Sequence, residues 1–277
     1  MHVSVLIAVA ILAVGLASGV LSALFGVGGA VLTTPGVRFL GLSPILAIGS
    51  TIPAILPGSI TGATRFQRQG LVSWRIGLVC GGSGAVLAVA GADVSDHVNA
   101  HLLMVITAGL LLLSGVQATR SPRAPADSPS GPSAEPTTAP ASTIVRKPAQ
   151  STAAPATGRL VLVGAAAGFV AGLLGVGGGV VLVPAFTALL HLRQKEAVAS
   201  SLVAVAVFSV PALITHSLLG HVDWAVALLL ALGVVPGAWI GSHITVNTSD
   251  RTLRRLCGAF FIILAVVYGA SELRAVL

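Results

Sequence analysis

A glycine-rich string occurs twice in this sequence, each time inside an apolar stretch. The first copy, LFGVGGAVLTTP, spans residues 24–35, and the second, LLGVGGGVVLVP, spans residues 173–184. Glycine lets a backbone turn sharply, and a helix that restarts after the turn directs its unpaired amide N–H groups at whatever lies there. Because a helix N-terminus attracts negative charge, the chemistry predicted for both strings is anion binding by backbone amides. No Lys-Ser/Thr pair follows either string, which argues against a nucleotide-binding loop.

Hydroxyl pairs and prolines recur at matching positions beyond the strings. Hydroxyl donors could complete a cage around an oxyanion, or they could bond to their own helix or to a neighbouring one. The prolines either bend a helix or free a carbonyl for substrate. The residues that we predict to bind substrate are Gly26, Gly28, Gly29, Pro35, Ser50, Thr51, Gly175, Gly177, Gly178, Gly179, Pro184, Ser200 and Ser201.

Other glycines follow a four-residue spacing, which is typical of close helix packing in membranes. For these we predict packing rather than ligand binding; they are Gly58/Gly62, Gly77/Gly81, Gly164/Gly168/Gly172 and Gly233/Gly237/Gly241.

The composition indicates an integral membrane protein. Of 277 residues, 55% are hydrophobic and only 8% are charged, and the mean hydropathy is +0.98. The apolar runs have the length of helices, so helices are favoured over a barrel. The net charge of +7 does not indicate nucleic-acid binding, because the basic residues lie in short loops between apolar segments. Cys80 and Cys257 are too few for a disulfide framework or a metal site.

The chain is divided into two similar halves. The strings align at an offset of 149 residues, and one gap later residues 47–52 match 197–202 and residues 70–74 match 220–224. We therefore predict a duplicated membrane protein with repeats at 1–119 and 159–277, joined by a disordered Pro/Ala/Ser/Thr-rich linker at 120–158. The expected helical segments are 3–24, 28–41, 45–63, 74–92, 101–119, 159–174, 178–191, 197–215, 223–243 and 252–273, and the first is expected to be a retained helix rather than a signal peptide.

The positions of the basic residues predict how these segments cross the membrane. If each glycine string joins two helices into a hairpin, thirteen of the 15 Lys and Arg residues lie on one side. If each half has four simple spans, the division is nine against six. The positive-inside rule favours the hairpins, with the linker in the cytoplasm and both termini outside. A hairpin plus three spans is an odd number of crossings, which predicts two inverted repeats in an all-α polytopic fold.

The expected substrate is a small anion held without a charged side chain. No Asp, Glu, Lys or Arg lies in the middle of an expected span, so a buried carboxylate for ion coupling is missing from the sequence pattern. No catalytic triad, metal-ligand spacing or paired carboxylate occurs at membrane depth. We therefore predict no enzyme activity, no cofactor and no metal; the bilayer and the anion are the expected partners.

The duplicated strings with their following prolines, and the later Gly-x-x-x-Trp segments at 70–74 and 220–224, resemble the TauE/SafE (DUF81) family of sulfite exporters and sulfonate permeases. The resemblance covers both apolar halves and excludes the linker. It implies transport of sulfite, a sulfonate or a related anion across the bacterial cytoplasmic membrane. It also carries the substrate-binding role of the strings over to Gly26, Gly28, Gly29, Gly175, Gly177 and Gly178. Ala30 departs from the pattern, because Gly179 occupies the matching place.

The predicted function is secondary transport of such an anion by alternating access, with export as the expected direction. Uptake of a related organic anion and an anion channel stay open as alternatives, since neither coupling nor direction is written in the sequence. A membrane scaffold without transport is an alternative of another class, in which the glycines serve packing alone. The oligomeric state is not predicted.

Overall fold

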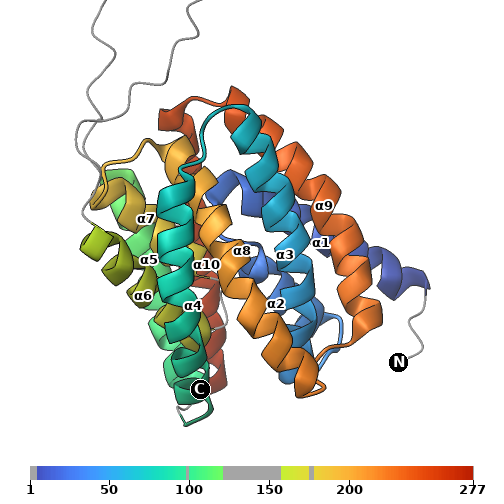
Figure 1. Ribbon diagram of the computed structural model, residues 1–277. Helices are drawn as coiled ribbons and strands as arrows, with labels where there is room; N and C mark the ends of the chain where they lie inside the picture. The colour runs from blue at the N-terminus through green and yellow to red at the C-terminus, as the bar shows by residue number, and fades with distance from the viewer. Residues whose placement is uncertain (1–4, 98–99, 121–156, 175–177, 277) are drawn as a thin grey trace, which may run out of the picture.

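The computed structural model describes residues 5–97, 100–120, 157–174 and 178–276, and all regular structure within these ranges is helical (Figure 1). The first half contains α1 (Val5–Phe25), α2 (Ala30–Phe39), α3 (Pro44–Arg68), α4 (Trp74–His97) and α5 (Ala100–Arg120). The second half contains α6 (Thr157–Leu174), α7 (Gly179–Ala188), α8 (Gln194–Leu218), α9 (Trp224–Asn247) and α10 (Asp250–Val276). The all-helical fold is thus confirmed, whereas nearly all of the predicted linker lies outside the described residues.

The first glycine string breaks the chain between α1 and α2. Gly26, Gly28 and Gly29 have φ angles of 71°, 81° and 84°, which a helix cannot contain. After the break α2 runs back along α1, so that the Ser18 hydroxyl donates to the Gly29 carbonyl at 2.7 Å. A Cβ at Gly36 would lie 2.7 Å from Val14, which extends the antiparallel contact. The predicted hairpin therefore forms in the first half.

The second string separates α6 from α7 in the corresponding place. Gly178 precedes α7 with a φ of 68°, as Gly29 precedes α2. Residues 175–177, which include the predicted Gly175 and Gly177, lie outside the described residues. Both α2 and α7 have ten residues, about half of what a membrane crossing needs.

Each hairpin packs against the opposite half of the chain. The helix α1 lies along α9, where a Cβ at Gly15 would be 2.7 Å from the Leu230 carbonyl oxygen. In the same way α6 lies along α4, and a Cβ at Gly164 would collide with the backbone of Cys80. Glycines line both contacts at four-residue spacing, and they are Gly15, Gly19, Gly164, Gly168, Gly172, Gly233, Gly237 and Gly241. The packing role predicted for the 164–172 and 233–241 glycines is confirmed.

In two further pairs of helices, a helix of the first half packs against the corresponding helix of the second half. The helix α3 packs against α8 in the middle of the molecule, and α5 packs against α10. Across the molecule α4, α8, α3 and α9 lie side by side in this order (Figure 1). The interior of this arrangement is mainly apolar, with Phe66, Phe186 and Phe261 fully buried, and it also contains buried serines and threonines.

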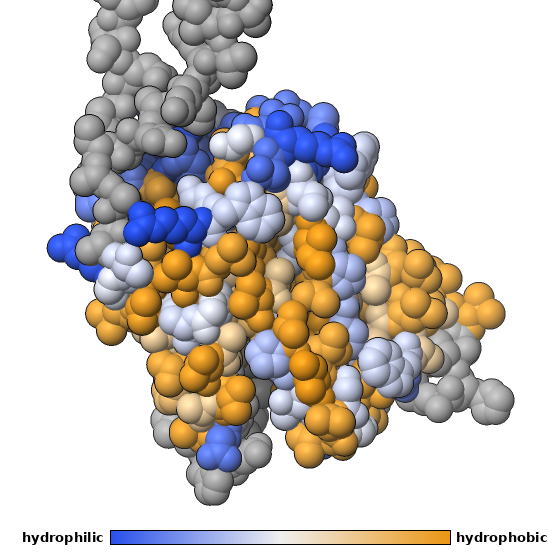
Figure 2. All heavy atoms as spheres, in the orientation of Figure 1, coloured by the Kyte–Doolittle hydropathy of each residue, from blue (hydrophilic) through white to orange (hydrophobic). Residues whose placement is uncertain are grey.

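Basic residues collect where several helix ends meet. Arg75 at the start of α4 donates to Thr157 at the start of α6, and the Lys195 amide of α8 donates to Asp250 of α10. The end of α3 meets the end of α9 through Arg65. Figure 2 shows this end as hydrophilic, whereas the sides of the molecule between its ends are mainly hydrophobic. The helices α6 and α8 therefore begin at one end, as the hairpin prediction requires.

Five of the described helices are long and apolar enough to cross a membrane: α1, α3, α4, α8 and α9. Several helices extend beyond the segments expected from hydropathy, because the helical backbone continues through polar residues at the helix ends. The helix α3, expected at 45–63, continues to Arg68, where basic side chains suit the negative end of the helix dipole. The helix α2 is shorter than expected, because the three left-handed glycines delay its start to Ala30.

Candidate functional site

The two glycine strings meet in the interior. A Cβ added to Gly179 would lie 2.5 Å from the Cα of Val27 and would collide with the carbonyl oxygen of Gly26. Only a residue without a side chain permits such close contact of two backbones. The start of α7 thus lies directly against the break that precedes α2, and the two helix N-termini share one region of the core.

One face of α8 lines both strings. Ser201, Val205 and Phe208 follow one another at helical spacing on this face. The Ser201 hydroxyl donates to the Gly26 carbonyl at 2.9 Å and also to its own helix at Val198. Val205 lies 2.5 Å from the position of a Cβ at Gly28, and Phe208 lies 2.8 Å from that of Gly178. These apolar side chains pack against the strings, so the site is closed in this conformation.

The carbonyl of Gly29 is the most heavily hydrogen-bonded group of the first string. It accepts the hydroxyls of Ser18 at 2.7 Å and Thr33 at 3.1 Å, together with the amides of Leu32 and Thr33. The sequence interpretation missed both hydroxyls, although Ser18 lies on the same helical face as Ser22 and the string. These bonds fix the turn from which α2 starts.

The predicted hydroxyls Ser50 and Ser200 are held in a reciprocal exchange between the halves. Ser50 accepts the backbone N–H of Asp223 at 2.9 Å, directly before α9 begins. Ser200 accepts the N–H of Ser73 at 3.1 Å, directly before α4 begins. The alternative of interhelical hydrogen bonding is therefore realised by both, and their predicted contact with substrate stays a prediction.

Thr51 differs from its counterpart Ser201 in its partners. The Thr51 hydroxyl donates to Ile48 of its own helix at 2.9 Å and lies 3.4 Å from the hydroxyl of Thr34 on α2. Thr51 is buried, and it links α3 to the first hairpin. Ser201 instead reaches the string itself.

The two predicted prolines lie inside α2 and α7. Pro184 has no N–H to donate to the carbonyl four residues earlier, which belongs to Val180. The hydroxyl of Ser114 on α5 donates to this carbonyl at 3.2 Å. Pro184 thus frees a buried carbonyl, which a neighbouring helix uses; its predicted contact with substrate stays a prediction.

No buried charge accompanies these groups in the part of the chain that the structure describes. The buried polar residues there are Ser, Thr and one Gln, and no Asp, Glu, Lys or Arg is among them. The same residues contain no group of three His, Cys, Asp or Glu side chains that could hold a metal ion. Any ion held at the strings would meet backbone dipoles and hydroxyls.

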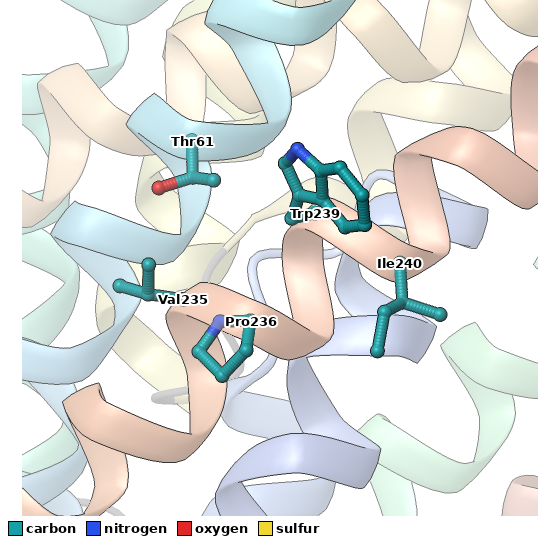
Figure 3. Close-up of a pocket in the computed structure, with 5 residues that line it drawn as sticks. All are labelled: Thr61, Val235, Pro236, Trp239 and Ile240. Carbon is teal, nitrogen blue, oxygen red and sulfur yellow. The ribbon is translucent and has the colours of Figure 1, made fainter.

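A hollow of about 450 Å³ lies away from the strings, between α3 and α9. Figure 3 shows its lining by Thr61, Val235, Pro236, Trp239 and Ile240. The guanidinium of Arg65, one turn beyond Thr61 on α3, lies over the Trp239 ring at 4.6 Å from its centre and is hydrogen-bonded to His243. Trp239 and Ile240 are exposed on the apolar outer surface, so the hollow faces the lipid rather than the two strings.

The sequence model of a known family covers most of this arrangement. The family described as "Sulfite exporter TauE/SafE" matches residues 11–268, from α1 to α10. This chain belongs to the TauE/SafE family. No solved structure matches the chain.

Curated relatives of this TauE/SafE protein span most of its length. It is 26% identical to the probable membrane transporter protein YunE of Bacillus subtilis over 85% of this chain and 86% of that protein. It is 26% identical to a probable membrane transporter protein of Xylella fastidiosa over 91% of this chain and 90% of that protein. It is 23% identical to the probable membrane transporter protein MJ0441 of Methanocaldococcus jannaschii over 87% of each chain.

The TauE/SafE protein is thus a multi-pass membrane transporter, and it takes a small-molecule substrate as its family implies. The predicted resemblance and the prediction of a transporter rather than an enzyme are confirmed by the family. The relatives' names do not say which molecule they carry.

Proposed function

We propose that this protein is a secondary transporter that exports a small anion, with sulfite or a sulfonate as the first candidates. The observation that carries the proposal is the contact of Gly179 with Gly26 and Val27. It brings the N-termini of two short helices together inside an apolar core. Such termini favour anions, and the low dielectric of the core strengthens the attraction.

The donors near the strings suit an oxyanion without a countercharge. The amides in the first turn of a helix have no intrahelical acceptor, and hydroxyls can turn their hydrogen toward a ligand. Because the described residues bury no basic side chain, binding would be weaker than in a salt bridge and release would be easier. That balance suits a carrier, which must let its substrate go on the far side.

Alternating access requires the strings to separate. The first hairpin packs with α9 and the second with α4, so each string belongs to a group of helices from both halves. We propose that these two groups move against each other about the central pair α3 and α8. Val205 and Ile55, which occupy matching positions on that pair, both adjoin Gly28 and would mark the centre of the movement.

We also propose that the two halves are inverted repeats in the cytoplasmic membrane of a bacterium, with the linker inside and both termini outside. The shared basic end of α3, α4, α6, α8 and α10 supports this orientation through the positive-inside rule. A reporter active only in the cytoplasm should give signal when inserted into the linker and none at the C-terminus. Signal at both places would overturn the inversion.

Transport is tested in two steps on the purified full-length protein. Thermal stability is first measured with sulfite, thiosulfate, methanesulfonate and acetate, since a ligand that binds the folded state raises the melting temperature. If none of the four anions raises the melting temperature, the anion proposal is contradicted and a scaffold is favoured. Counterflow of the stabilising anion in proteoliposomes then separates a carrier, which shows trans-stimulation, from a channel, which does not.

Direction is tested in cells. Deletion of an exporter should raise the internal level of the anion after a load, whereas deletion of an uptake permease should lower its entry. The second result would replace export by uptake and leave the binding site unchanged.

A further inference from the structure

Ser59 of α3 is fully buried, and its hydroxyl has no hydrogen-bond partner within the part of the chain that the structure describes. A buried hydroxyl without a partner is costly, because it has given up its bonds to water. A serine in a helix can usually bond to the carbonyl four residues earlier. Ser59 leaves that bond unmade, so its donor is available for another acceptor.

The neighbours of Ser59 on α3 show which way it faces. Ile55, one turn before it, lies 3.5 Å from the position of a Cβ at Gly28. A Cβ at Gly62 would lie 2.8 Å from Leu202 of α8 and 3.8 Å from Ala23 of α1. Residues 55, 59 and 62 share one face of the helix. The face of α3 that carries Ser59 therefore lies against α8 and the segment from Ala23 to Gly28, beside the first glycine string.

The matching residue of the second half behaves differently. Ser209 on α8 corresponds to Ser59 at the offset of 150 residues, and its hydroxyl donates to Val205 of its own helix at 2.8 Å. Both serines are buried in equivalent helices. Ser209 therefore donates its hydroxyl hydrogen within its own helix, whereas the hydroxyl of Ser59 does not.

We propose that Ser59 is a substrate-binding residue whose hydroxyl donates to an oxygen of the transported anion; this inference rests on the proposed function. The anion would lie at the first string, between the amides at the start of α2 and the hydroxyl of Ser59 on α3. The hydroxyl of Ser201 on α8 would join them by exchanging its bond to the Gly26 carbonyl for one to the anion. Donors from three separate elements can each reach a different oxygen of sulfite or a sulfonate, which have three oxygens, whereas a carboxylate offers only two.

The test compares Ser59→Ala with Ser209→Ala in the full-length purified protein, with sulfite as the probe. For Ser59→Ala we expect sulfite binding to weaken about ten-fold, as for a lost hydrogen bond to a charged group. Its melting temperature without ligand should not fall, because no bond of the unliganded protein is removed. For Ser209→Ala we expect a slightly lower melting temperature and unchanged sulfite affinity.

Ser59→Cys gives a second reading that keeps the side-chain volume but has a much weaker donor. Its sulfite affinity should fall as well, and its preference for sulfite over acetate should narrow. If wild-type protein binds sulfite and both Ser59→Ala and Ser59→Cys bind it with the same affinity, the role of Ser59 is overturned. The proposed function would not be affected by that result. If sulfite, thiosulfate and methanesulfonate all fail to bind the wild-type protein, the proposed function itself fails.

Discussion

The two hairpins have similar helices but differ in the polarity of their side chains. The first carries buried hydroxyls at Ser18, Ser22 and Thr33, and the half-buried Thr34 lies beside Thr51. The matching positions of the second hairpin, at an offset of 149 residues, are Ala167, Ala171, Leu182 and Val183. Both hairpins thus have a left-handed glycine directly before their second helix, at Gly29 and Gly178, whereas the polar side chains belong to the first.

The contacts that hold the halves together are much more symmetric. Ser50 and Ser200 exchange equivalent hydrogen bonds, and glycine stripes pack α1 on α9 and α6 on α4 in the same way. The contacts between the halves are thus alike on both sides of the molecule, whereas the two hairpins differ in the polarity of their side chains. A shared frame allows both string regions to meet, and a polar first hairpin would give the ligand one preferred side.

Packing beside the strings also differs between the halves. On one side Phe208 of α8 fills the space that Gly84 of α4 leaves open. At the matching pair on the other side, Gly58 of α3 leaves the space and Val234 of α9 fills it. The ring of Phe208 also packs against Gly178, whereas Gly28 of the first string packs against Val205 and Gly29 against Ser18.

The largest loss of stability is expected at the contact of the two strings. Gly179→Ala would drive a methyl group into the backbone of Gly26 and Val27, which no rotamer change can relieve. Overpacking of this kind should cost about 3 kcal/mol and abolish transport. Ala30→Gly, at the matching position, should cost only about 1 kcal/mol from helix propensity. Melting temperatures in detergent check both, and a Gly179→Ala protein as stable as Ala30→Gly would show that the strings do not touch.

Much of this site could be predicted from sequence because backbone breaks depend on glycine itself. The breaks at Gly26 to Gly29 and before Gly179, and the helix starts at Trp74 and Trp224, follow from local residue types. The pairing of α1 with α9 could not be predicted, since small-residue stripes fit many partners. The role of Ser59 could not be predicted either, because the sequence does not show whether the hydroxyl of a serine in a helix has a hydrogen-bond partner.

The next largest effect compares the two helix N-caps. Gly29→Ala and Gly178→Ala both force a side chain into a left-handed conformation, at about 1–2 kcal/mol. Gly178→Ala should cost more, because its methyl group meets the buried ring of Phe208, whereas Gly29→Ala meets the rotatable hydroxyl of Ser18.

Gly220→Ala is the control for these caps. Gly220 also has a left-handed backbone, with a φ of 70°, but a Cβ added to it would have no atom within 4 Å. It should show the conformational cost without the collision. Thermal unfolding of all three proteins measures the order. Equal losses in the three would mean that packing at the strings adds nothing to backbone strain.

A smaller effect is expected at the exchanged hydrogen bonds. Ser200→Ala leaves the Ser73 amide without its partner, which should cost about 1–2 kcal/mol. Ser50→Ala should cost less, because the side chain of Asp223 still caps α9 through the amides of Ala225 and Val226. The two losses should add in the double variant, since the serines act on different helices. A greater loss in Ser50→Ala than in Ser200→Ala would contradict this account of the frame.

The smallest effect sharpens the contrast between the hairpins themselves. Ser18→Ala removes one of four donors to the Gly29 carbonyl, and side-chain hydrogen bonds between membrane helices average about 0.6 kcal/mol. The turn keeps its other three donors, so stability should fall by about that amount. Ala167→Leu, the apolar control in the second hairpin, should instead destabilise by overpacking, because Ala167 is fully buried. If Ser18→Ala leaves stability unchanged but weakens anion binding, the hydroxyl serves the ligand more than the turn, and the polarity of the first hairpin is a property of the binding site.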